Sequence, residues 1–253
     1  MRRILVLIIF GVILLLGACS KELTKGSISP NDQFQRAMAL HEKGDYLKAQ
    51  GEFQTLIYSS PGLTFIDTAQ YYLAMTYFNI KSYPEAIGEF KKLLQTYPSS
   101  ALADDAQFNL ALAHYKESPK FALDQTETYA AIDEYGIFLD RYADSPLAAE
   151  AQKNLDILYD KLAKKLFKSG ELYLKLRNYE PALLYFEQVR DNYPSTEWAQ
   201  LAMYYTGVAQ MKMGRKPEAI ETFQNYILAF PEHKLIPKAQ KNIIKLGIVS
   251  AGD

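Results

Sequence analysis

The sequence predicts an all-α protein, an α-solenoid of about five helix pairs with a C-terminal capping helix. Blocks that begin at Tyr46 and Tyr83 match at an offset of 37 residues, and blocks that begin at Tyr179 and Lys216 repeat that offset further on. Each block carries an alanine, an aromatic residue four positions later and a proline after eight more. A repeat of this length with helical spacing is typical of stacked helix pairs.

Residues 1–18 are predicted to be a signal peptide. Arg2 and Arg3 precede an apolar run that ends at Leu16 and is followed by small residues. The run is shorter than the roughly 20 apolar residues of a membrane-spanning helix, so a retained membrane helix is the less favoured alternative. The sequence from Leu16 to Cys19 resembles the bacterial lipobox, which implies that Cys19 is lipidated and begins the mature chain. The alternative for this cysteine is a small core residue.

Residues 19–30 are predicted to be a lipidated tether. They show no apolar periodicity and include Gly26, Ser27 and Ser29, a composition typical of a flexible linker. Ser20 stands where lipoproteins retained in the inner membrane carry Asp. The lipobox resemblance therefore implies an outer-membrane protein that faces the periplasm.

Each predicted pair consists of a first helix with a small residue and a second helix whose aromatic ring fills the gap beside it. The small residues are Ala37, Ala74, Ala111, Gly170 and Gly207. The second helices carry the pairs Ala49/Phe53, Ala86/Phe90, Ala131/Tyr135, Ala182/Phe186 and Ala219/Phe223. A proline after tyrosine, as at Tyr97 and Pro98, is expected to end the second helix, because proline disfavours a helical conformation at the residue before it.

The pairs fall into two predicted regions. Residues 31–146 hold units one to three, and residues 147–253 hold units four and five and the capping helix. An insertion around 118–128 interrupts unit three, whereas 147–176 keeps helical spacing without proline and predicts one long helix. A last helix over about 237–249 is expected to cover the open end of the stack.

The turn Gly44-Asp45-Tyr46, repeated as Gly214-Arg215-Lys216, resembles the turn of tetratricopeptide (TPR) repeats. The resemblance covers residues 32–233 and implies a TPR-like solenoid. No copy carries the tryptophan that TPR repeats usually have in the first helix.

A second apolar row on the first helices has no predicted role in stacking the pairs. It occupies the positions three before, one after and four after each small residue, and so lies on a separate helix face. The functional interpretation is a groove for an extended or helical peptide with aromatic side chains. The alternative is that the row is core, covered by other parts of the chain. The row comprises Phe34, Met38, His41, Tyr71, Met75, Phe78, Phe108, Leu112 and Tyr115.

A basic run marks the long helix of unit four. Two interpretations stay open: a solvated helix face, or a docking surface for an acidic partner. The run consists of Lys161, Lys164, Lys165 and Lys168.

Composition argues against several classes of function. The formal net charge is −1, which disfavours nucleic-acid binding. One Cys and three widely separated His provide no metal-site spacing, and no cofactor is predicted. Adjacent carboxylates such as Asp104 and Asp105 point about 100° apart on a helix, and no nucleophile is evident near them. The sequence therefore predicts a protein that is not an enzyme.

Together, the lipobox, the TPR-like units, the insertion and the long helix resemble the BamD family of outer-membrane lipoproteins. The resemblance is closest over residues 148–196, which include Tyr159 to Lys164 and Asn192 to Thr196. It implies a scaffold of the β-barrel assembly machine that binds a BamA-like subunit, other Bam lipoproteins and the aromatic C-terminal segments of unfolded outer-membrane proteins. The alternative is a periplasmic TPR lipoprotein that coordinates cell-wall synthesis or envelope constriction.

Overall fold

The computed structural model describes residues 28–249, and every regular element within that range is an α-helix. The helices are α2 (Pro30–Glu42), α3 (Tyr46–Ser59), α4 (Ile66–Asn79), α5 (Tyr83–Thr96), α6 (Ala103–Glu117), α7 (Thr126–Arg141), α8 (Ala148–Lys175), α9 (Tyr179–Asn192), α10 (Glu197–Lys212), α11 (Lys216–Ala229) and α12 (Ile236–Val249). The signal peptide and Cys19 lie outside the described residues.

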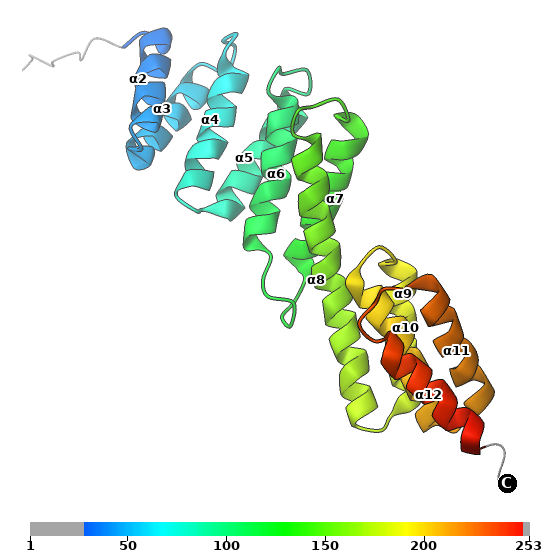
Figure 1. Ribbon diagram of the computed structural model, residues 1–253. Helices are drawn as coiled ribbons and strands as arrows, with labels where there is room; N and C mark the ends of the chain where they lie inside the picture. The colour runs from blue at the N-terminus through cyan, green and yellow to red at the C-terminus, as the bar shows by residue number, and fades with distance from the viewer. Residues whose placement is uncertain (1–27, 250–253) are drawn as a thin grey trace, which may run out of the picture.

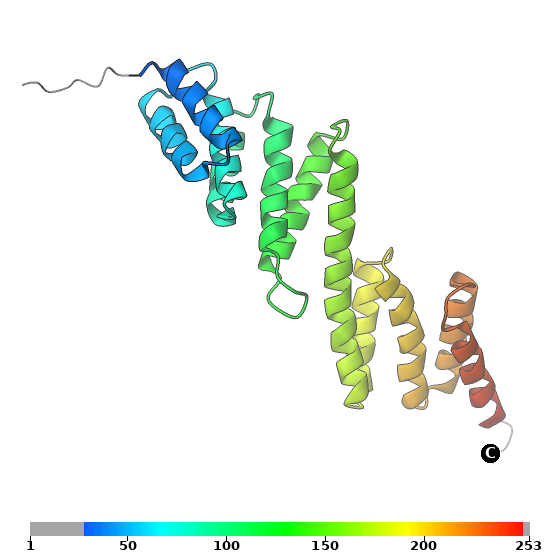
Figure 2. The ribbon, with the colours of Figure 1, turned by 60° about the vertical axis from the view of Figure 1, so that its left-hand side comes forward.

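The helices form five antiparallel pairs and a final single helix, stacked in chain order (Figure 1). Each helix packs mainly against its neighbours in the sequence. The array is elongated, with α2 at one end and α12 at the other in both views (Figures 1 and 2). This architecture confirms the predicted all-α solenoid of five pairs and a capping helix.

The predicted alanine and aromatic pairs form the centre of every unit. All ten of these side chains, from Ala49 and Phe53 to Ala219 and Phe223, are 0% exposed. In unit four the ring of Phe186 lies against Gly170, where a Cβ atom would approach the ring to 2.7 Å. The small residue therefore makes room for the ring, as the spacing predicts.

A polar contact that the repeat analysis missed joins the two helices of units one to three. The amide Nε2 of Gln33, Gln70 and Gln107 donates to the backbone carbonyls of Glu52, Glu89 and Glu134 at 3.3, 3.3 and 3.1 Å, and also to their carboxylates. Leu166 and Met203 occupy the glutamine position in units four and five. Units one to three thus share a glutamine–glutamate hydrogen bond between their two helices, and units four and five lack it.

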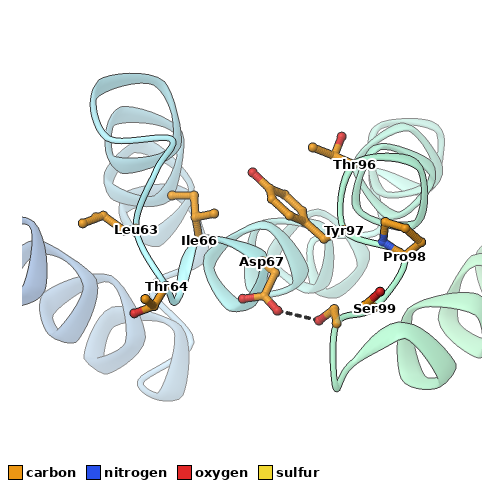
Figure 3. Close-up of a pocket in the computed structure, with 9 residues that line it drawn as sticks. Leu63, Thr64, Ile66, Asp67, Thr96, Tyr97, Pro98 and Ser99 are labelled. Carbon is orange, nitrogen blue, oxygen red and sulfur yellow. Dashed lines mark hydrogen bonds between the residues drawn. The ribbon is translucent and has the colours of Figure 1, made fainter.

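Unit boundaries carry a second repeated contact. Asp67 on α4 accepts a hydrogen bond of 2.6 Å from Ser100 in the loop after Tyr97 and Pro98, as Figure 3 shows. At the next boundary Asp104 accepts a bond of 3.1 Å from Ser145. These bonds fix the loop that follows α5 and the loop that follows α7 onto the first helix of the preceding unit.

The long helix α8 connects the two regions of the solenoid. Leu155 and Leu158 in its N-terminal half belong to the core of unit three, and Ala163 and Phe167 belong to the core of unit four with Phe186. The helix predicted over 147–176 is confirmed as Ala148–Lys175.

The two ends of the array are closed in different ways. At the C-terminal end, Ala239 and Leu246 of α12 pack on Phe223, so the predicted capping helix is confirmed. At the other end α2 begins at Pro30, inside the segment predicted to be tether, because Ser29 caps it by accepting a hydrogen bond from the backbone N–H of Asp32 at 3.2 Å. None of the helices within residues 28–249 combines the length and hydropathy needed to cross a bilayer.

Candidate functional site

The predicted apolar row runs along α2, α4 and α6 and lies where each first helix meets its own second helix and the next first helix. Eight of its nine members are partly exposed, and Phe108 is buried. The row is therefore a half-buried seam, and a guest could contact only its outer edge.

In unit one, the row packs toward unit two. The ring of Phe34 lies 4.8 Å from that of Phe65 and 6.4 Å from that of Phe53, measured between centroids. His41 Nδ1 lies 2.9 Å from Thr76 Oγ1, and the threonine hydroxyl donates to the carbonyl of Tyr72. Because that hydroxyl has a single proton, the imidazole is the donor of the bond between units.

In unit two, Tyr71 joins unit three in the same way. Its hydroxyl accepts a hydrogen bond of 3.2 Å from the side-chain amide of Asn109, and its ring lies 6.0 Å from that of Phe90. Burial and the nearby Asp105 carboxylate raise the pKa of the Tyr71 phenol. The phenol therefore stays neutral and acts as a hydrogen-bonding group. Phe78 packs on Tyr83 at 5.2 Å.

In unit three, the row partly departs from the prediction. Phe108 is 5% exposed and packs edge-on against Tyr135 and Phe138, at 5.9 and 5.6 Å. The expectation that this ring faces a guest is wrong, because α7 covers it. Tyr115 stays partly exposed, with Lys161 Nζ 5.9 Å from its ring centroid.

The basic run on α8 contacts the loop between α6 and α7, residues 118–125. Lys161 donates to Ser118 Oγ at 2.7 Å, and Lys165 donates to the carbonyl of Leu123. Lys164 Nζ lies 4.8 Å from the Phe121 ring centroid. Burial lowers the pKa of Lys161.

The same lysines reach further along the C-terminal half. Lys164 and Lys168 lie 5.6 and 6.0 Å from the Trp198 ring, and Lys168 pairs with Glu171 at 2.9 Å. Lys161, Lys164 and Lys165 thus hold the insertion loop on the long helix, whereas Lys168 contacts only α8 and α10. Docking of an acidic partner at these groups stays a prediction.

A family model described as YfiO, outer membrane lipoprotein, matches residues 27–222 and again residues 160–239. The chain belongs to this family. The resemblance predicted from the lipobox and the repeats is therefore confirmed.

Relatives of this YfiO-family chain include the outer membrane protein assembly factor BamD of Rickettsia prowazekii (strain Madrid E). The two are 27% identical over 208 residues, which is 81% of this chain and 83% of the relative. Among solved structures, a tetratricopeptide repeat protein from Parabacteroides merdae aligns with a TM-score of 0.39 at 15% identity, over 86% of this chain and 73% of its own. MamA from Desulfovibrio magneticus aligns with a TM-score of 0.42 at 13% identity, over 81% and 97%.

The sequence interpretation missed a groove, lined by both apolar and polar side chains, across α3, α4 and α5 of the YfiO-family chain. It has a volume of about 490 Å³, and its walls include Ile57, Leu73 and Tyr97. Tyr58 at its edge is 92% exposed, and Gln70 Oε1 below it has no hydrogen-bond partner among the described residues. The available signal was that Tyr58 follows Phe53 by five residues, which places an aromatic ring about 140° from the buried face.

We expect the free energy of unfolding to fall as pH drops below about 6.5, the ordinary pKa of histidine. Burial lowers the pKa of His41 in the folded chain, although Glu42 opposes the shift. The unfolded chain then binds the proton more readily than the folded chain, so acid favours unfolding. Urea denaturation at pH 7.5 and 5.5 should show a smaller difference for His41→Gln than for wild type. An unchanged difference would contradict this role.

Proposed function

We propose that this chain is a non-catalytic scaffold for the assembly of outer-membrane β-barrels, held on the periplasmic face of the outer membrane by lipid on Cys19. Membership in the YfiO family over most of the described residues is the observation that carries the proposal. The relative named an outer membrane protein assembly factor adds support. An elongated stack of helices suits such a role, because it offers long surfaces to several partners at once.

The proposed partners divide between the two regions. The C-terminal region, 147–253, is the docking region for the periplasmic domains of a BamA-like subunit and for other Bam lipoproteins. The lysines of α8 lie at its boundary with unit three. Their contacts to loop 118–125 fix the loop relative to the docking region, and an acidic partner could compete for the same ammonium groups.

The N-terminal region, 31–146, is the proposed receptor for aromatic C-terminal strands of unfolded outer-membrane proteins. The outer edge of the row offers thioethers and rings from successive helix pairs, which suits a bound segment that carries several apolar side chains. Met38 and Met75 occupy corresponding positions in units one and two and are partly exposed. Methionine adapts its shape to different apolar side chains, so it suits clients of varied sequence. Phe108 supports this edge from below and does not contact the guest.

Replacing Met38 and Met75 together by glutamine should weaken the binding of a barrel C-terminal peptide about tenfold, or about 1.4 kcal/mol. Glutamine keeps the length of the side chain and removes the apolar contact, while the helices retain good helix formers. Fluorescence anisotropy with a labelled peptide measures the change. Met213→Gln, at the C-terminal end of α10, is the matched control and should bind as wild type does. Equal affinities for all three proteins would refute the proposed receptor edge.

Co-purification from detergent-solubilised outer membrane tests the function as a whole. The full lipoprotein should recover a BamA-like barrel subunit in amounts comparable to its own. Recovery of peptidoglycan synthases without a barrel subunit would overturn barrel assembly and favour the envelope-coordination alternative.

A further inference from the structure

The loop between α11 and α12 carries a histidine where the corresponding loops carry a hydroxyl side chain. This position holds Ser100 after α5, Ser145 after α7, Thr196 after α9 and His233 after α11. Ser100 and Ser145 each accept a hydrogen bond from the backbone N–H two residues later, at 3.2 and 3.3 Å. His233 does the same with its imidazole, because Nδ1 accepts from the N–H of Leu235 at 3.2 Å. The last loop thus uses a titratable group for a bond that two earlier loops make with a neutral one.

A buried tyrosine accompanies this histidine in unit five. Three residues after the buried ring of each second helix, units one to four carry the apolar residues Leu56, Leu93, Phe138 and Val189. Unit five carries Tyr226 there, which is 0% exposed and whose hydroxyl hydrogen-bonds to His233 Nδ1. Burial raises the pKa of the Tyr226 phenol to about 12, so the hydroxyl keeps its proton. Because the Leu235 N–H can only donate, Nδ1 is unprotonated and accepts both bonds, and the neutral ring carries its proton on Nε2.

The surroundings of the imidazole offer little compensation for a positive charge. Nε2 is buried and has no hydrogen-bond partner among the described residues. Glu197 on α10 is engaged by Lys234, the next residue of the loop, at 3.0 Å, and Glu232 is exposed. Every charged side chain of α12 is a lysine, and the acidic residues of α11 lie in its first two turns, away from this loop. Burial therefore lowers the pKa of His233; Lys234 adds to the shift and Glu197 opposes it.

We propose that His233 is an acid-sensitive switch that holds the capping helix α12 on unit five at neutral pH and releases it in acid. Protonation of Nδ1 turns the acceptor into a donor, which then faces the N–H of Leu235. The hydroxyl of Tyr226 can rotate and accept instead, but the backbone amide cannot, so the bond beside the first turn of α12 is lost. Release of α12 would uncover the apolar core around Phe223, which the end of a solenoid needs to have covered.

The direction of the switch follows from where the proton binds more readily. In the released loop His233 has the ordinary histidine pKa of about 6.5, whereas in the closed loop its pKa is lower. The contact is therefore complete above about pH 6.5 and weakens as the pH falls through the lowered pKa of the closed loop. His41 lies on α2 at the other end of the array, so its titration acts on a different helix pair (Figure 1).

Hydrogen exchange measured by mass spectrometry on the full lipoprotein in detergent micelles tests the switch. Exchange rates at pH 7.5 and pH 5.0 are divided by the intrinsic rates at each pH, and the resulting protection factors are compared helix by helix. We expect the protection factor of α12 to fall about tenfold at pH 5.0, which corresponds to a difference of one unit between the two pKa values. The protection factors of α8 and α9 should change by less than about twofold.

Replacing the imidazole by a neutral acceptor tests whether His233 is responsible. His233→Thr introduces the residue that the loop after α9 carries as Thr196, and its hydroxyl accepts from the Leu235 N–H at either pH. Protection of α12 in this variant should change by less than about twofold between the two pH values. His233→Gln, whose amide oxygen accepts the same bond, is a second variant. His41→Gln is the matched control and should keep the tenfold response of α12.

Three outcomes would overturn the switch. They are equal protection of α12 at both pH values in the wild type, an equal loss in the wild type and His233→Thr, or a simultaneous loss across all helices, which would indicate global unfolding. The first and third need no variant, so they decide the question even where a substituted protein does not fold. The switch does not depend on barrel assembly being the function, which co-purification tests separately.

Discussion

Phe186→Ala should lower the free energy of unfolding by about 3–5 kcal/mol, the usual cost of removing a fully buried aromatic ring. The ring is 0% exposed and contacts Phe167 and Tyr205, at centroid distances of 5.5 and 6.0 Å. Gly170 on the opposite side has no side chain that could move into the space. The cavity would therefore persist. Urea denaturation measures the loss, and a cost below about 1 kcal/mol would show that units four and five repack without the ring.

A substitution at Gly170, which contacts the Phe186 ring, tests the same packing from the other side. Gly170→Ala should cost about 1–3 kcal/mol, because the new Cβ would meet the ring at 2.7 Å. In a Phe186→Leu background the same change should cost less, since the smaller side chain leaves room. Gly88→Ala on α5 is the matched comparison: no atom lies within 4 Å of its added Cβ, so it should stabilise the helix by up to about 1 kcal/mol. Equal effects at Gly170 and Gly88 would contradict the packing account.

Cys19→Ser should move the protein from the outer-membrane fraction to the soluble periplasmic fraction. The acyl chains implied at Cys19 would each contribute about 0.8 kcal/mol per buried CH₂, so several chains hold a protein on a bilayer almost permanently. No helix within residues 28–249 could replace that anchor as a membrane span. Fractionation of cell envelopes after a high-salt wash measures the change.

Ser20→Asp provides the control for the anchor. By the sorting rule that the lipobox resemblance implies, this variant should stay lipidated but remain in the inner membrane. Persistence of Cys19→Ser in the outer membrane after the wash would mean that partner proteins alone retain the chain there.

Local spacing was enough to predict the frame of the molecule. An alanine and a ring four residues apart must share a helix face, so the five buried pairs follow from the sequence without knowledge of the tertiary structure. Absence of proline over 147–176 likewise predicts α8 to within one residue at each end. The glutamine–glutamate hydrogen bond was also visible in the sequence, because Gln33 and Glu52 recur 37 residues later as Gln70 and Glu89.

Coverage of the second row could not be predicted in the same way, because it depends on how neighbouring units approach each other. Phe34 and Phe108 occupy equivalent positions, three residues before Ala37 and Ala111. Phe34 stays partly exposed, whereas Phe108 is enclosed by rings of α7. The partners of the α8 lysines depend on the path of the 118–125 insertion, for which the repeat offers no template. Tertiary packing therefore decides which residues of the second row are core and which are surface, and sequence periodicity does not describe that packing.

The continuity of α8 has a mechanical consequence. At 1.5 Å per residue, its 28 residues form a rod of about 42 Å. Adjacent domains usually pivot at a linker, but here the backbone passes from one region to the other as unbroken helix, so reorientation would require elastic bending of the rod. Two ligands held at opposite ends would therefore be kept at a nearly constant separation, and the molecule would act as a spacing gauge between them.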